Sequence, residues 1–447
     1  MSTTASEVAA GQHAQIGVLT QTDNREDHTS HPDAQWFPGA GLGVFLHWGI
    51  SSVTGEGDLS WSMMHRPAGG RVAADKQYGP FAVQRIVPPA QYWKQAEDFL
   101  ADRYDPKKWM AALKAAGVRY AVLTTKHHDG FALWPSNVGD FNTKNYLGGR
   151  DLVGEFVEAC REFDIKIGFY YSPPDWWFDR NVMSFNYGDN KPTMDIHHQA
   201  ADLSHITAEA REAHAQAHRE FVAAQTEELL TRYGKIDILW FDGSADNAMS
   251  MERIRELQPG ILVNRRGLGI GDFETPECAF PKEPIPGWWE YCHIWNDGAW
   301  GYLKHETYKP IGWLTGELVK ARAWGGNMLI NMGPDMHGEL PYTAYRRLEE
   351  LGEWLKVHGE AVFDVEAGPW PDKCNVPVTV RGGTWYIQAH ALVEGDIVLS
   401  AIDAPKCAHW MRSGEPVQFA AVGGTFVYAL PSGMPSADGD VIVVNWG

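Results

Sequence analysis

The order of apolar and polar positions indicates strands that alternate with helices over most of the chain. Short apolar runs bounded by glycine or charged residues predict strands, and segments with a 3.6-residue apolar repeat predict helices between them. Strands are expected at residues 43–49, 119–125, 166–172, 236–242, 261–264, 289–295 and 327–331. Helices are expected at residues 105–117, 151–163, 249–257 and 311–324, with a long helix that ends near Gly234 and another that ends at Gly359. Such alternation indicates parallel strands joined by crossover helices.

Seven of these strands are clear, and a closed (β/α)8 barrel of the TIM type needs an eighth. Polar side chains that follow the strands favour the barrel, because all strand ends then converge on its C-terminal mouth. They are His47, His127, His128, Asp242, Arg266 and Asn331. We therefore predict an α/β fold built on a (β/α)8 barrel and infer its eighth strand. A doubly wound open sheet is the alternative architecture.

The character of the sequence changes on both sides of the barrel region. From Val362 onward, short alternating runs such as 385–387, 397–402 and 441–444 are separated by Gly, Pro, Asp and Ser, which is typical of an antiparallel β-sandwich. Residues 1–33 are polar and show neither the basic nor the apolar region of a signal peptide. We expect a flexible leader at 1–33, a catalytic barrel at 34–363 and a C-terminal β-sandwich at 364–447.

Composition and charge argue against two kinds of partner. With 57 acidic against 38 basic side chains the formal net charge is −19, so a polyanion such as nucleic acid would be repelled. No stretch approaches 18 consecutive apolar residues, so no membrane span is expected. The 20 Trp residues exceed what a core needs, and aromatic platforms against sugar faces would use them.

The cysteines and the leader bear on location. The five Cys residues are widely spaced and include no C-x-x-C pair, which predicts neither a disulfide framework nor a structural zinc site. Because the leader does not read as a signal peptide, we expect a cytoplasmic protein. The sequence leaves the oligomeric state open, with a homo-oligomer among the alternatives.

Asp242 is the strongest candidate for a reacting carboxylate. It ends the strand 236–242 and would lie at the barrel mouth, with Trp240 on the same face. Position alone leaves it equally open as a nucleophile or as a turn or helix-capping residue. Retaining glycoside hydrolysis also needs a second, protonated carboxyl about 5 to 5.5 Å away. The segment 271–290 offers five candidates: Asp272, Glu274, Glu277, Glu283 and Glu290.

Four motifs follow one another along the chain: LHWG at 46–49, TKHHDGFALW at 125–134, LWFDG at 239–243 and NMLINMGP at 327–334. In this order they resemble the retaining α-L-fucosidases of glycoside hydrolase family 29, and the resemblance covers residues 34–363. It implies an exo-acting enzyme that removes terminal α-L-fucosyl residues from glycans by double displacement, with neither a cofactor nor a metal. The implied partner is a fucosylated oligosaccharide or glycoconjugate.

The resemblance also implies roles for single residues. Asp242 matches the nucleophile, and Glu277, at the end of a D-F-x-T-x-E stretch, matches the acid/base. Glu290 and Asp272 are its substitutes, and Glu290 could instead be a buried carboxylate that orients a histidine or an arginine. The residues expected to hold the fucose are His47, Trp61, His127, His128, Trp240, Arg266 and Glu290.

Two other classes of function remain open at this point. Many members of that family carry Glu directly before the Trp in the loop after the first strand, where this chain has Ser60 before Trp61. Ser60 and the uncertain acid leave a non-catalytic fucose-binding barrel as the alternative. His127 and His128 could hold a metal in a metal-dependent hydrolase. However, adjacent strand residues point to opposite faces, and no acidic cluster completes a ligand set.

Overall fold

Eight parallel strands form one sheet that curls into a barrel. The computed structural model describes residues 5–19, 27–65, 85–188, 192–245, 247–389, 395–400, 403–428 and 438–446. The strand order is β5-β4-β3-β2-β1-β8-β7-β6, and a parallel bridge between Asn264, just after β5, and Phe273 of β6 joins the two edges. The strands are β1 (Leu42–Leu46), β2 (Tyr120–Lys126), β3 (Lys166–Tyr171), β4 (Ile238–Phe241), β5 (Leu262–Val263), β6 (Phe273–Glu274), β7 (Trp288–Ile294) and β8 (Asn327–Met332).

The predicted barrel is confirmed, and its eighth strand is β6. This strand spans only Phe273–Glu274, which is too short to give a recognisable apolar run. The described residues 264–272 and 275–287 contain no helix, so β5, β6 and β7 follow one another without the usual crossover helices. The alternation on which the sequence argument depends is therefore absent at this part of the barrel.

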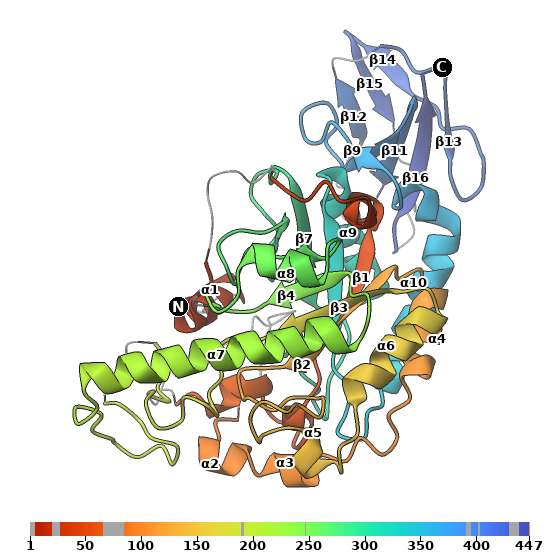
Figure 1. The fold of residues 1–447 in the computed structure, drawn as a ribbon. Helices are drawn as coiled ribbons and strands as arrows, with labels where there is room; N and C mark the ends of the chain where they lie inside the picture. The colour runs from red at the N-terminus through yellow and green to blue at the C-terminus, as the bar shows by residue number, and fades with distance from the viewer. Residues whose placement is uncertain are drawn as a thin grey trace.

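Helices pack around the outside of the barrel, as the sequence predicts (Figure 1). Four of the longer ones begin after a side chain that accepts hydrogen bonds from backbone N–H groups of the first turn: Asp105, Asp151, Thr207 and Ser250. The barrel helices are α4 (Pro106–Ala115), α6 (Leu152–Glu162), α7 (Ala208–Arg232), α8 (Met251–Leu257), α9 (Ile311–Ala323) and α10 (Tyr342–His358). Shorter helices are α2 (Pro89–Tyr92), α3 (Gln95–Asp98) and α5 (Thr143–Tyr146), with 3-10 turns at Pro32–Ala34, Phe37–Gly39, Ile50–Val53, Leu59–Met63 and Gly359–Ala361.

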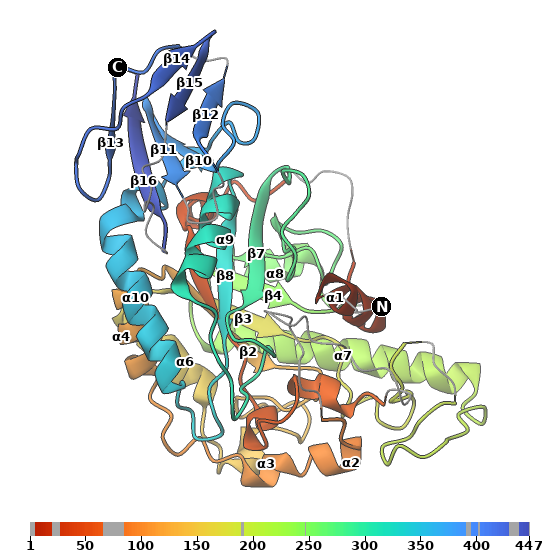
Figure 2. The ribbon, with the colours of Figure 1, turned by 180° about the vertical axis from the view of Figure 1, so that it is seen from behind.

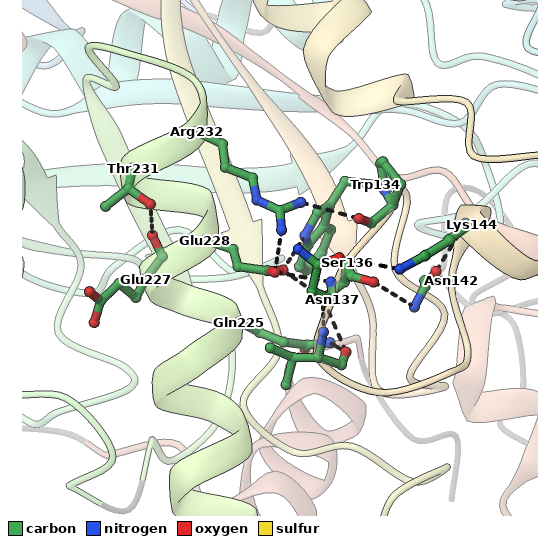
Figure 3. Close-up of polar contacts among 12 residues, drawn as sticks. Trp134, Ser136, Asn137, Asn142, Lys144, Gln225, Glu227, Glu228, Thr231 and Arg232 are labelled. Carbon is green, nitrogen blue, oxygen red and sulfur yellow. Dashed lines mark hydrogen bonds and ion pairs between the residues drawn. The ribbon is translucent and has the colours of Figure 1, made fainter.

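The loop after β2 is tied to α7 through the carboxylate of Glu228 (Figure 3). This carboxylate accepts hydrogen bonds from Trp134 Nε1 at 2.9 Å and from Ser136 Oγ at 2.6 Å. It also accepts from the backbone N of Asn137 at 3.0 Å and pairs with Arg232 on the next turn of the helix. Because the loop continues from the histidine pair at the end of β2, the network holds the segment that carries both imidazoles.

The C-terminal region is a two-sheet antiparallel β-sandwich, as predicted. One sheet has the order β13-β16-β11-β10-β9 and the other β12-β15-β14, and both contribute to one apolar core. The region lies beside α9 and α10 (Figure 2), where Trp354 Nε1 donates to the carbonyl of Gly439 at 3.1 Å. Its strands are β9 (Glu366–Ala367), β10 (Val378–Arg381), β11 (Thr384–Ala389), β12 (Ile397–Ser400), β13 (Cys407–Trp410), β14 (Ala420–Val422), β15 (Thr425–Tyr428) and β16 (Asp440–Asn445).

Part of the segment expected to be a flexible leader is a helix. Helix α1 (Ala5–Ile16) lies beside β4, on the side of the barrel away from α10 (Figures 1 and 2). Its Ile16 is 5% exposed and belongs to the main apolar core. The helix has almost no amphipathic repeat, so its packing depends on contacts that the local sequence does not reveal.

Composition led to two further expectations, one about disulfides and one about membrane spans. All five Cys thiols are free. Among the described residues, no helix is both long enough and apolar enough to cross a membrane.

A buried ion pair lies under the mouth of the barrel. Lys126, the last residue of β2, donates to Asp175 Oδ2 at 2.8 Å and to Tyr171 Oη at 3.2 Å. The Lys126 and Asp175 side chains are 0% and 1% exposed. Because each charge has lost its hydration, each depends on the other for compensation.

Removal of one member of the Lys126–Asp175 ion pair should therefore destabilise the folded protein. We predict that Asp175→Ala lowers the free energy of unfolding by about 3 to 5 kcal/mol, since it leaves the Lys126 charge buried and unpaired. Urea denaturation followed by tryptophan fluorescence measures the loss. The double variant with Lys126→Met leaves no buried charge and should lose less than Asp175→Ala alone. An equal or greater loss in the double variant would contradict this account.

Candidate active site

A small pocket opens at the C-terminal ends of the barrel strands, where the sequence places the reacting groups. Seven of the nine predicted site residues line it: His47, Trp61, His127, Trp240, Asp242, Arg266 and Glu277. Four residues that the sequence analysis did not select also line it: Phe45, Tyr170, Cys292 and Trp300. The remaining lining residues come from α1. The structure thus collects side chains from the ends of at least five strands, as the fold requires.

Asp242 follows β4 and faces the pocket with two donors on its carboxylate. Tyr170 Oη donates to Oδ2 at 2.7 Å, and Arg266 Nη1 donates to Oδ1 at 3.1 Å. The Asp242 side chain is 13% exposed, so the two donors replace most of its hydration. A carboxylate that two donors hold in this way is oriented for attack, as a nucleophile needs to be.

Glu277 shares the same guanidinium. Arg266 Nη2 donates to Glu277 Oε2 at 2.6 Å, so one arginine bridges the two carboxylates. A parallel bridge between Glu277 and Cys292 sets the glutamate beside β7. Burial alone would raise the pKa of Glu277, but Arg266 and His13 outweigh burial and hold that pKa well below its usual range. The two carboxyl groups therefore lie close together across one pocket.

His47 has a defined tautomer. Asn331 Nδ2 donates to the carbonyl of Trp300 at 2.6 Å, which turns the amide oxygen of Asn331 toward the imidazole. His47 Nδ1 therefore donates to Asn331 Oδ1, at 2.6 Å. Burial lowers the pKa of His47 to about 4, so the ring is neutral at pH 7. Its Nε2 is then an acceptor for a hydroxyl.

The histidine pair after β2 is held by two serines. Ser60 Oγ lies 2.5 Å from His127 Nδ1 and accepts from the backbone N of Asp129 at 2.9 Å. Ser60 therefore supports a histidine of the pocket wall. Burial lowers the pKa of His127 well below its usual range. The His127 ring stacks on Tyr170 with centroids 5.6 Å apart.

His128 lies behind the pocket surface and is fully buried. Ser172 Oγ donates its proton to the carbonyl of Pro174 at 2.6 Å. His128 Nδ1 lies 2.6 Å from Ser172 Oγ and therefore donates to that hydroxyl oxygen. Burial lowers the pKa of His128 to about 3, which leaves Nε2 as a bare acceptor. Among the described residues Nε2 has no hydrogen-bond partner, and it lies 3.6 Å from Asp242 Oδ2.

His127 and His128 do not face opposite ways, so the expectation from strand alternation is wrong. The register of β2 on β3 shifts between Thr124 and Lys126, and the strand ends before the pair. His127, His128 and Asp242 thus bring one ligand atom each within 4.8 Å of one another. Two imidazoles and a carboxylate can bind a transition metal, but the guanidinium of Arg266 beside Asp242 disfavours a cation there.

Glu290 does not contact the pocket, contrary to the expected sugar-binding role. It is 0% exposed inside the barrel, where Trp240 Nε1 donates to Oε1 at 2.7 Å and Tyr120 Oη donates to Oε2 at 2.8 Å. Burial raises the pKa of Glu290 to about 7, against the effect of the two donors. Glu290 therefore orients a tryptophan of the pocket wall, whereas the sequence suggested a histidine or an arginine.

Asp272, the other substitute for the acid/base, has a structural role. It is fully buried and accepts hydrogen bonds from Thr29 N at 2.8 Å and Val263 N at 2.8 Å. It also pairs with Arg255 at 2.7 Å. Of the three carboxyls considered for the acid, Glu277 is the one that faces Asp242 across the pocket.

Tyr170 and Trp300 are two of the pocket residues that sequence reasoning missed. Tyr170 is on the inner face of β3, and the pattern KIGFYYS at 166–172 gave a strand without marking which Tyr faces inward. Strand alternation places Tyr170 on the opposite face from Phe169 and Tyr171, but it does not show which of the two faces is the inner one. Trp300 lies in the described loop after β7, where no periodicity assigns an orientation.

A parallel eight-stranded barrel whose mouth holds two carboxylates across one histidine- and tryptophan-lined pocket defines the protein as a barrel glycoside hydrolase. A family profile described as "Alpha-L-fucosidase" matches residues 8–360. The chain belongs to the α-L-fucosidase family.

Individual relatives agree over most of the chain. The tissue alpha-L-fucosidase of Mus musculus is 30% identical over 388 residues, which cover 81% of this chain and 77% of that protein. The structure of alpha-L-fucosidase isoenzyme 1 from Paenibacillus thiaminolyticus gives a TM-score of 0.76 at 28% identity, over 93% of this chain and 99% of that one. The Thermotoga maritima alpha-fucosidase in complex with a mechanism based inhibitor gives 0.69 at 26% identity, over 97% and 98%.

The buried carboxyl of Glu290 should make stability depend on pH. The folded protein keeps this group protonated up to about pH 7, whereas the unfolded chain loses the proton near the ordinary value of 4.5. Because the folded state binds more protons in that window, stability falls as pH rises from about 5 to 7. Glu290→Gln does not titrate, so its unfolding free energy relative to the wild type should rise over this range in urea titrations.

The exposed Glu283→Gln is the matched control and should show no such trend. A difference between Glu290→Gln and the wild type that stays constant from pH 5 to 7 would show that the Glu290 pKa is not raised.

Proposed function

We propose that the protein is an exo-acting, retaining α-L-fucosidase in which Asp242 is the nucleophile and Glu277 the acid/base. One observation supports this assignment above the others: a single guanidinium, that of Arg266, bridges the two carboxylates inside one pocket. Retention needs a close pair of carboxyl groups, one to attack the sugar and one to transfer protons. The family membership of residues 8–360 supports the substrate.

In the first step an Asp242 oxygen attacks the anomeric carbon of the fucosyl group. The bond from that carbon to the leaving oxygen breaks, and Glu277 transfers its proton to that oxygen. The product is a fucosyl ester of Asp242 and a free aglycone alcohol. In the second step Glu277 takes a proton from water, whose oxygen attacks the same carbon and releases the Asp242 carboxylate. No cofactor takes part in this scheme.

Tyr170 prepares Asp242 for attack. Its hydroxyl donates to Oδ2, so one carboxylate oxygen is held while the other remains near Arg266. Burial raises the pKa of Tyr170 well above its usual range, so the phenol stays a donor at every working pH. A nucleophile that is already oriented loses no further conformational freedom in the transition state. This lowers the activation barrier of the attack considerably.

Neutral imidazoles suit the recognition of sugar hydroxyls. His47 offers a bare Nε2 acceptor, because Asn331 holds its Nδ1 proton, and the His127 ring also lines the pocket. The Trp240 ring, fixed through its Nε1 on Glu290, offers an apolar face for the C6 methyl group of fucose. These contacts select a deoxy sugar with several free hydroxyl groups.

The substrate class follows from the same site. A terminal fucosyl residue of an oligosaccharide or glycoconjugate is the expected partner. The charge of −19 disfavours strongly acidic glycans at a distance.

We also propose a cytoplasmic location, supported by the five free thiols. Size-exclusion chromatography with light scattering tests whether the protein is a homo-oligomer.

The nucleophile assignment predicts a near-complete loss of turnover in Asp242→Ala. We expect kcat on an aryl α-L-fucoside to fall by at least about 10⁴-fold, because no other group can form the ester. Azide should restore part of the activity, since it fits the space of the missing carboxylate, and the product should be a fucosyl azide of inverted configuration. Full activity of Asp242→Ala would refute the assignment.

The acid/base assignment predicts an effect that depends on the leaving group. With Glu277→Gln, hydrolysis of a fucosyl oligosaccharide should fall by about 10² to 10⁴-fold, because the sugar alkoxide needs a proton. Formation of the ester from a nitrophenyl fucoside should fall far less, as measured by the burst of nitrophenol. The matched amide variant Glu274→Gln should behave like the wild type. Equal losses on both substrates would contradict the role of Glu277.

A further inference from the structure

Helix α1 forms one wall of the catalytic pocket and leaves no room for a sugar. Gln12, His13 and Ile16 line the cavity, whose volume is about 30 Å³. A cavity of about 150 Å³ is what accommodates benzene, and a fucosyl ring has more atoms than benzene. For a fucosyl group to reach Asp242, the α1 residues that line the cavity must therefore move.

The helix contacts the acid/base directly and the loop after β3 at a second point. His13 Nε2 lies 2.7 Å from Glu277 Oε2, on the oxygen that Arg266 also contacts. Farther from the pocket, Gly188 N donates to Gln15 Oε1 at 2.9 Å. One of these contacts involves a reacting group and the other does not, so their effects can be separated by substitution.

Backbone hydrogen bonds anchor the C-terminal end of the helix. Ser244 N donates to the carbonyl of Ile16 at 3.0 Å, and Leu19 N donates to the carbonyl of Arg266 at 2.9 Å. The preceding turns are held by side-chain contacts instead. Because backbone anchors do not depend on the side chains at 12, 13 and 15, the helix can swing away from the pocket while this end stays attached.

Docking of the helix also carries a cost. Gln12 is 3% exposed, and among the described residues its Nε2 has no hydrogen-bond partner. A buried donor without a partner opposes the docked position, because water would satisfy it once the helix leaves. In the docked position His13 and Arg266 also hold the pKa of Glu277 well below its usual range, and an ionised Glu277 has no proton for the leaving group.

We propose that α1 is a cap that closes the catalytic pocket in the free protein and leaves it when a fucoside enters, with the contacts of His13 and Gln15 holding it closed. This inference rests on the proposed fucosidase function. The apparent affinity for substrate is then reduced by the fraction of molecules whose pocket is open. Weaker docking raises that fraction.

The first test weakens docking at a distance from the chemistry. Gln15→Ala removes one hydrogen bond of the cap and should lower KM for nitrophenyl α-L-fucoside by roughly two- to tenfold, the change in equilibrium that one such bond supplies. Ala14→Ser, on the exposed face of the same helix, is the control and should leave KM unchanged. A KM that is unchanged or raised in Gln15→Ala overturns the cap.

The second test follows the helix itself in the wild-type protein. Hydrogen exchange of the amides in residues 9–16 is measured with and without saturating L-fucose. A displaced cap predicts faster exchange with fucose, whereas slower or unchanged exchange in an active enzyme overturns the cap and leaves the proposed function intact. A protein that neither cleaves the nitrophenyl fucoside nor binds L-fucose overturns the proposed function, and the cap with it.

Discussion

The guanidinium of Arg266 lies between two carboxylates that would otherwise repel each other in a pocket with little water. Asp242 and Glu277 are 13% and 8% exposed, and one positive charge contacts both. Without it, one carboxyl would have to take up a proton or the pocket would have to open to solvent. The arrangement demands that the ends of β4 and β5 and the segment before β7 stay at fixed separations. The short bridge between Asn264 and Phe273, which closes the barrel, supplies that constraint.

Two imidazoles, one in the pocket wall and one just behind it, are kept without charge. His47 and His128 are buried, which lowers their pKa values to about 4 and about 3. Asn331 and Ser172 then fix the proton on Nδ1 of each ring. Uncharged imidazoles can bind hydroxyl groups without disturbing the charge balance around Arg266. Below the pocket, the Glu290 carboxylate accepts a hydrogen bond from the Trp240 indole N–H and so fixes the orientation of that ring.

Much of the fold could be predicted because its signals are local. The inner strands are long apolar runs, and helices such as α4 and α6 begin at Asp105 and Asp151, which cap them. β6 could not be predicted, because two residues are too few to show a repeat of apolar positions. Helix α1 could not be predicted either, because its fixed position comes from contacts with the loops near Ser244 and Gly188, far away in sequence.

In the candidate site, the sequence identified several residues, but it did not show how their side chains are oriented or buried. Asp242 and Glu277 could be selected from motifs, and the structure places both in one pocket. Sequence could not show that Glu290 lies inside the barrel, because burial is set by the strands around it. The alternation rule also failed for the imidazoles after Lys126, since a register shift ends regular pairing there. Motifs thus identified reacting groups, whereas orientation required tertiary contacts.

The stereochemistry of the first product tests the mechanism most directly. Proton NMR during the hydrolysis of a nitrophenyl α-L-fucoside distinguishes the two anomers of fucose before they interconvert. Double displacement through Asp242 and Glu277 predicts that α-L-fucose appears first and that the β anomer grows in later by mutarotation. Initial formation of β-L-fucose would show a single displacement by water and would contradict the roles assigned to both carboxylates.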